Sequence, residues 1–230
     1  MPLTKMRQAC SSWSMRGAVA CFWVLATVIV LAGSGWSYAD GPGDHDGPFK
    51  VDERFHYDDS GIWSRNVQLG LQYSLVAAAI GVAVYEGSES RLGLTAWKTM
   101  DSMLLTAGAV QLMKVGFSRS RPGQTDDAGK FFQGNGNRSF PSGEVANVAA
   151  ALVPAMLEYG HEEPWLYALT GTLVTYDAVA RMKTQGHWLS DVIAGAAVGA
   201  GIGYAIHERE NSLIVSPLPG GVFVGLKKRF

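Results

Sequence analysis

One short segment of the sequence holds a histidine and an aspartate at a spacing that suits nucleophilic chemistry. His187 and Asp191 are four residues apart, so one turn of helix would bring the carboxylate beside the imidazole. The carboxylate would then accept a hydrogen bond from one ring nitrogen and leave the other free as a nucleophile. Such pairs also occur for structural reasons alone. Arg181 lies six residues before His187, and Asp177 precedes it at a spacing that would orient the guanidinium.

Two further segments carry groups that bind anions. Lys114 and Arg121 are seven residues apart, close to two helical turns, and Pro122 follows directly. Two cations on one side suit the oxygens of a phosphate, although basic residues near a helix end are usually solvated. Ser142 and Gly143 open an Ala- and Val-rich segment. They predict either a plain helix cap or a helix start whose free N–H groups bind an anion.

The order and joint spacing of these segments resemble the three-part signature of the type 2 phosphatidic acid phosphatase superfamily. That family includes bacterial class A acid phosphatases and vanadium haloperoxidases. The chain reads K-x6-R-P, then P-S-G, then R-x5-H-x3-D, and the resemblance covers residues 114–191. It implies an all-helical fold and a phosphate held without a metal or other cofactor. The implied phosphate-binding residues are Lys114, Arg121, Ser142, Gly143 and Arg181.

The resemblance also implies a mechanism. His187 would attack phosphorus in line and form a phosphohistidine, while Asp191 would stabilise the charged ring. The family's second motif normally ends in a histidine that protonates the leaving oxygen, and this chain has Glu144 there. If Glu144 held a proton, it would replace that acid. As a carboxylate it would repel phosphate and leave a weak enzyme or an inactive anion-binding protein. We favour the active enzyme, because every other site residue is present.

The expected activity is hydrolysis of a small phosphate monoester, a lipid phosphate or a lipid diphosphate. Alternatives are phosphoryl transfer to an alcohol and a vanadate-dependent haloperoxidase, although the missing histidine argues against the latter. Nucleic acid is excluded as a partner, because 19 Lys and Arg against 20 Asp and Glu give a net charge of −1 and no basic field. No feature of the sequence indicates an oligomeric state.

The elements that must position these residues are helices. Apolar residues recur at helical spacing in five segments, separated by Pro and Gly: 66–85, 95–117, 145–157, 165–182 and 190–206. Two short apolar runs, 212–216 and 222–226, flank a Pro- and Gly-rich turn and predict a C-terminal β-hairpin. We therefore predict an all-α helical bundle that forms one domain over residues 61–230.

The first sixty residues predict an exported chain. Residues 1–39 begin with positive charges, continue with an uncharged apolar run and end with small residues before a cleavage site. This pattern is typical of a secretory signal peptide. Cleavage would deliver the chain to the periplasm and remove both cysteines, Cys10 and Cys21. An uncleaved anchor helix is the alternative. Residues 40–60, rich in Gly, Asp and Pro, predict an exposed polar arm.

The sequence favours helices that are buried in a soluble bundle. Most of the uncharged stretches are shorter than the roughly 20 residues that a bilayer core requires. The segment 66–85 is long enough but contains Asn66, Gln68 and Gln72. Association with a membrane surface, or insertion into the bilayer, is the alternative to this prediction.

Overall fold

A computed structural model describes residues 51–210 except residue 135, together with residues 215–218 and 221–224. The predicted signal peptide lies outside the described residues. Within them, five long helices follow a 3-10 turn at Gly61–Trp63: α2 (Arg65–Glu86), α3 (Arg91–Phe117), α4 (Gly143–Tyr159), α5 (Trp165–Lys183) and α6 (Leu189–His207). Strand β1 (Val215–Leu218) pairs antiparallel with β2 (Gly221–Val224). The predicted all-α fold is confirmed, and each helix begins and ends within four residues of its predicted range.

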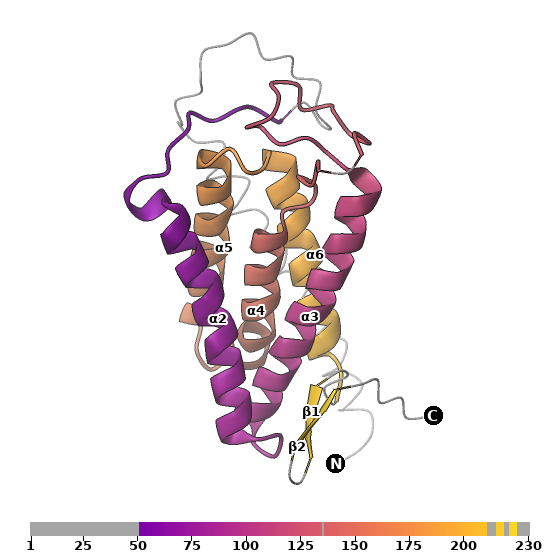
Figure 1. The fold of residues 1–230 in the computed structure, drawn as a ribbon. Coiled ribbons are helices and arrows are strands. Elements are labelled where there is room, and N and C mark those ends of the chain that lie inside the picture. Colours follow the sequence, from indigo (N-terminus) through magenta and orange to yellow (C-terminus); the bar gives the residue numbers. More distant parts are fainter. Residues whose placement is uncertain (1–50, 135, 211–214, 219–220, 225–230) are drawn as a thin grey trace, which may run out of the picture.

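Helix α4 forms the centre of the bundle, with the other helices around it (Figure 1). Its most extensive contacts are with α6 and α3, followed by those with α5 and α2. Valines that have no exposed surface fill the space between α4, α5 and α6: Val145, Val148, Val153, Val174 and Val192. Burial of apolar surface of this kind is the main driving force of folding. The core therefore holds α4 rigidly, and the start of α4 faces the end of the bundle where the loops cross.

The contact between α4 and α6 depends on glycine. Gly195, Gly199 and Gly203 recur at every fourth residue of α6, on the side that faces α4. A Cβ atom on Gly195 would lie 2.4 Å from the Ser142 carbonyl oxygen, and one on Gly199 would lie 2.0 Å from that of Ala146. Both distances are below any real Cβ contact. These glycines bring the backbone of α6 against the first turns of α4.

Within residues 51–60, most side chains are exposed, but two side chains of the predicted arm are buried. Asp52 is 4% exposed and Phe55 is 5% exposed. Phe55 packs in the main hydrophobic cluster, and the Asp58 N–H donates to the Lys183 carbonyl at 3.0 Å. The polar composition of the segment concealed these two anchoring residues. In Figure 1 the segment crosses the end of the bundle where α4 begins. Residues 40–50 of the predicted arm lie outside the described residues.

The outward face of α2 carries many exposed apolar side chains. Helices α2 and α6 are both long and apolar enough to cross a membrane. Only 22% of the most apolar window of α2 is buried inside the bundle, against 50% for α6. The outward side chains of α2 are largely apolar and include Val67, Tyr73, Ile80 and Val84. This face differs from the polar exterior that the prediction of a soluble bundle implies.

We expect Gly199→Ala to separate α6 from α4 and to lower the free energy of unfolding by about 1–3 kcal/mol, the usual cost of overpacking. Gly201→Ala is the matched control, because a Cβ there meets nothing within 4 Å and alanine favours a helix more than glycine does. Thermal unfolding of the purified full chain compares the two variants. A Tm for Gly199→Ala equal to that of the control would show that the close contact is not needed.

Candidate active site

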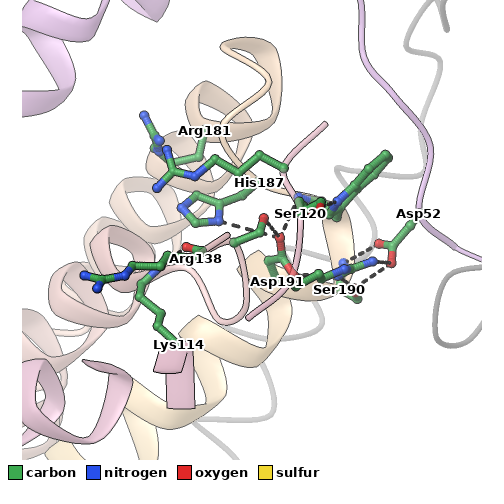
Figure 2. A network of polar contacts seen from close by, with 12 residues as sticks. Asp52, Lys114, Ser120, Arg138, Arg181, His187, Ser190 and Asp191 are labelled. Carbon is green, nitrogen blue, oxygen red and sulfur yellow. Dashed lines mark hydrogen bonds and ion pairs between the residues drawn. The ribbon is translucent and has the colours of Figure 1, made fainter. Parts of the chain in front are cut away.

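The residues that the sequence singled out come from the ends of four helices and meet at one end of the bundle. Lys114 lies in the last turn of α3 and Arg181 in the last turn of α5, while Glu144 and Asp191 lie in the first turns of α4 and α6. Figure 2 shows Lys114, Arg181 and His187 close to Asp191. An open pocket of about 480 Å³ extends from Arg181 and from Gly186, the residue before His187, and three arginines line it: Arg65, Arg121 and Arg181.

His187 is buried directly before α6, with 3% of its surface exposed. Its Nδ1 atom lies 3.6 Å from Oδ2 of Asp191, slightly beyond hydrogen-bonding distance. This arrangement turns Nδ1 toward the carboxylate and leaves Nε2 as the ring nitrogen for chemistry. Burial lowers the pKa of His187 to about 4, and the charges of Lys114 and Arg181 act in the same direction. The imidazole is therefore neutral at physiological pH, as a nucleophile must be.

A buried network holds Asp191 from three sides (Figure 2). Arg119 donates from Nη1 to Oδ1 of Asp191 at 2.5 Å. The other oxygen, Oδ2, accepts from the backbone N–H of Trp188 at 3.0 Å and from the hydroxyl of Ser139. Because all of these groups are buried, the carboxylate has little freedom to turn. The network therefore fixes the oxygen that faces His187.

The same arginine ties Asp191 to the N-terminal segment. Arg119 has no exposed surface and donates from Nη2 to Oδ2 of Asp52 at 2.6 Å. Asp52 also accepts from the backbone N–H of Ser190 at 2.7 Å and from its hydroxyl at 2.6 Å. The guanidinium lies over the ring of Phe131, 4.6 Å from its centroid. Sequence reasoning missed this network, because Asp52 lies in a segment predicted to be exposed.

Two of the predicted cations have fixed positions. Lys114 donates from Nζ to the Arg138 carbonyl at 2.7 Å. Arg181 donates from Nη1 to Oε1 of Gln68 at 3.0 Å, and Gln68 has no exposed surface. A Cβ on Gly186 would lie 2.2 Å from Nη2 of Arg181, so a glycine is needed there to leave room for the guanidinium. The sequence offered no signal for the roles of Gln68 and Gly186.

At the start of α4, one of the two predicted amide donors already has a partner within the protein. The N–H of Ser142 donates to the Asp191 carbonyl at 2.9 Å, so it is not available to a phosphate. The hydroxyl of Ser142 is buried and has no hydrogen-bond partner among the described residues. Gly143 lies against Lys114, and its Cβ position is 3.5 Å from Cε of that lysine. The first turn of a helix has no internal acceptors for its N–H groups, so the Gly143 amide is suited to bind a phosphate oxygen.

Glu144 forms ion pairs with two arginines. Arg65 donates from Nη1 and Nη2 to its two oxygens at 2.5 and 2.6 Å, and Nε of Arg181 lies 3.4 Å away. Burial alone would raise the pKa of Glu144, but the hydrogen bonds from Arg65 and the charge of Arg181 outweigh burial and hold this pKa below its ordinary value. Glu144 is thus a carboxylate at neutral pH. This weighs against its predicted role as a proton donor.

The described residues contain no cluster of three or more His, Cys, Asp or Glu side chains that could hold a metal ion. The guanidinium, ammonium and amide groups at this site are of the kinds that suit phosphate. These features fit the class of helical proteins whose sites are suited to phosphoryl chemistry.

Comparison with known proteins agrees with this class. Residues 95–212 match the profile of the PAP2 superfamily, and the chain belongs to that family. The chain is also similar to the lipid A 1-phosphatase of Porphyromonas gingivalis, with 33% identity over 120 residues. This match covers 52% of the chain but only 24% of the relative, so the chain aligns with about a quarter of that protein. No solved structure matches the chain.

We expect Asp52→Ala to destabilise the fold and to lower any phosphate release, because Arg119 loses one of its two buried counterions and no longer fixes Asp191. Breaking a buried ion pair costs about 3–5 kcal/mol. The matched control is Asp126→Ala, which removes a carboxylate from an exposed ion pair with Arg54 and should change stability by less than about 1 kcal/mol. Denaturant unfolding measures both variants, and equal midpoints would show that the buried network is dispensable.

Proposed function

We propose that the chain is a phosphatase that transfers the phosphoryl group of its substrate to His187 and then to water. The observation that carries this proposal is the buried, neutral imidazole of His187 beside Asp191 and next to a pocket lined by arginines. Membership of the PAP2 superfamily and similarity to a lipid A 1-phosphatase support a phosphatase at the level of class. The roles of single residues are inferred from the geometry.

The proposed reaction has two in-line steps. Nε2 of His187 attacks phosphorus while Lys114, Arg121 and Arg181 neutralise the phosphate oxygens. The ring becomes positively charged as the N–P bond forms, and the Asp191 carboxylate, held by Arg119, stabilises that charge. Water then attacks the phosphohistidine, the N–P bond breaks, and inorganic phosphate leaves. Every protein group in this scheme lies at the same end of the bundle.

We further propose that the substrate is a lipid phosphate and that the bundle lies in a membrane. The segment 66–85 of α2 contains no charged residue, while Arg65 and Glu86 lie immediately outside it. This pattern fits a helix that spans the apolar core of a bilayer, with its charges at the two interfaces. Arg65 contacts Glu144, so the active site is level with one interface. A lipid headgroup at that interface would reach the pocket directly.

The predicted signal peptide and export to the periplasm remain proposals, because they depend on residues 1–39. The chief alternative function is an anion-binding protein without turnover. The ion pairs of Glu144 favour it, because they hold Glu144 as a carboxylate that cannot protonate a leaving oxygen. Measurement of phosphate release separates these two functions, and an added alcohol acceptor would reveal phosphoryl transfer.

We expect His187→Ala to abolish phosphate release by the purified full chain, because no other nucleophile is part of the proposed scheme. Release from an aryl phosphate should fall by at least about a thousandfold, to the level of the buffer. A radioactive phosphoryl group should be trapped on the unsubstituted chain in an acid-labile, base-stable form. His161→Ala, at the opposite end of the bundle, is the control. Equal rates with and without His187 would refute the phosphohistidine route, and no release by any protein would favour the anion-binding alternative.

A charge on the outer face of α2 should impair membrane insertion. Tyr73 is 69% exposed and lies near the middle of α2, where an Asp costs roughly 2.5–3.5 kcal/mol in a bilayer. We therefore expect Tyr73→Asp to reduce the fraction of full chain that resists an alkaline wash of isolated membranes. Asn66→Asp adds the same charge at the interface and should have little effect. Full recovery of the unsubstituted chain in the soluble fraction would contradict the proposed insertion.

A further inference from the structure

Arg65 is an additional cation at the pocket, and none of the three sequence motifs contains it. It begins α2, thirty residues before the match to the family profile begins. Its side chain is 39% exposed, and it lines the pocket together with Arg121 and Arg181. The three motifs already supply cations for one phosphate group. Arg65 therefore needs a separate explanation.

The position of Arg65 is fixed by hydrogen bonds to the buried Gln68 and to Asp59. Oε1 of Gln68 accepts from Nη1 of Arg65 at 3.2 Å and from Nη1 of Arg181 at 3.0 Å. Gln68 itself is anchored, because its Nε2 donates to the Trp63 carbonyl at 2.7 Å. The backbone N–H of Arg65 donates to Oδ1 of Asp59 at 2.6 Å. One buried amide thus holds two guanidinium groups side by side at the pocket.

The partner of Arg65 limits the chemistry of the site. Glu144 occupies the position of the family's acid histidine, and Arg65 keeps it as a carboxylate without a proton. An alcohol oxygen that leaves phosphorus needs a proton, because an alkoxide is a poor leaving group. A phosphate oxygen needs none, because its second pKa is only about 6. The site therefore suits a leaving group that departs as an anion and is stabilised by a cation.

We infer that the site cleaves a diphosphate bond in preference to a phosphate monoester, with Arg65 contacting the departing phosphate. This inference rests on the proposed phosphatase function and narrows its substrate to a lipid diphosphate. A guanidinium has five N–H donors in a planar fork. Arg65 uses two of its nitrogens for Glu144, and its remaining donors suit the oxygens of a second phosphate. A monoester offers no such second group.

The bonds and charges of this reaction balance without a proton donor. Nε2 of His187 forms a bond to the terminal phosphorus, and the bond from that phosphorus to the bridging oxygen breaks. The electron pair stays on the bridging oxygen, which leaves as the lipid monophosphate beside Arg65. Water then attacks the phosphohistidine, and the electron pair of the N–P bond returns to Nε2. The proton of the water passes to solvent.

The test uses the purified full chain in detergent with farnesyl diphosphate, farnesyl monophosphate and an aryl phosphate. The two lipids differ only in the second phosphate. The ratio of their kcat/KM values therefore measures the preference for a phosphate over an alcohol as the leaving group. Loss of general acid catalysis typically costs about a hundred- to ten-thousandfold. We therefore expect a diphosphate-to-monophosphate ratio of at least about tenfold. A ratio of one or below would overturn the inference.

Two substitutions test the assigned roles. Arg65→Gln should lower the ratio at least about tenfold, because it removes the contact to the leaving phosphate and frees Glu144 to take up a proton. Glu144→His should lower the ratio by improving cleavage of the monophosphate. Arg91→Gln removes an arginine paired with Glu158 and Glu162 at the opposite end of the bundle, and it should leave the ratio unchanged. An unchanged ratio in a folded Arg65→Gln variant would overturn the role of Arg65.

The same assay separates failure of the inference from failure of the proposed function. If none of the three substrates releases more phosphate than with His187→Ala, the proposed phosphatase function itself fails. If the aryl phosphate and both lipids are cleaved with similar kcat/KM values, the phosphatase function holds and only the preference for a diphosphate fails.

Discussion

The geometry of the site depends on one fully buried guanidinium. Arg119 lies between the carboxylates of Asp52 and Asp191, and none of the three side chains has exposed surface. Removing three charges from water is costly, so this arrangement is stable only because every charge has close, well-oriented partners. The planar fork of arginine allows two carboxylates to be held at once. The N-terminal segment, the loop after α3 and the start of α6 are therefore fixed relative to one another.

Close packing of α6 against α4 links the position of Asp191 to the other side of the pocket. The glycines of α6 let its backbone approach the first turns of α4, and the Ser142 N–H reaches the Asp191 carbonyl at 2.9 Å. The position of Asp191 thereby determines where α4 begins. Since α4 is buried from Val145 onward, the helix behind the pocket is closely packed. The pocket is accordingly rigid on the side of His187, and its more exposed side is formed by Arg65 and Arg121.

The sequence predicted the fold and part of the site for clear physical reasons. Helical periodicity is a local property, so the five helices were predicted to within four residues, and the motif spacing indicated that Lys114, Arg181 and His187 would meet. The contacts of Asp52 and Arg65 are long-range, joining residues 67 and 79 positions apart in the chain. No local pattern reveals such partners. The charge state of Glu144 was likewise open, because it depends on Arg65.

Arg65 also explains how a carboxylate can be tolerated inside an anion site. The start of α4 and the guanidinium of Arg181 both attract Glu144, and a phosphate must compete with it for the same groups. Arg65 binds both oxygens of Glu144 at 2.5 and 2.6 Å, whereas Arg181 keeps only a 3.4 Å contact. Glu144 thus pairs mainly with Arg65, away from the position proposed for the phosphate.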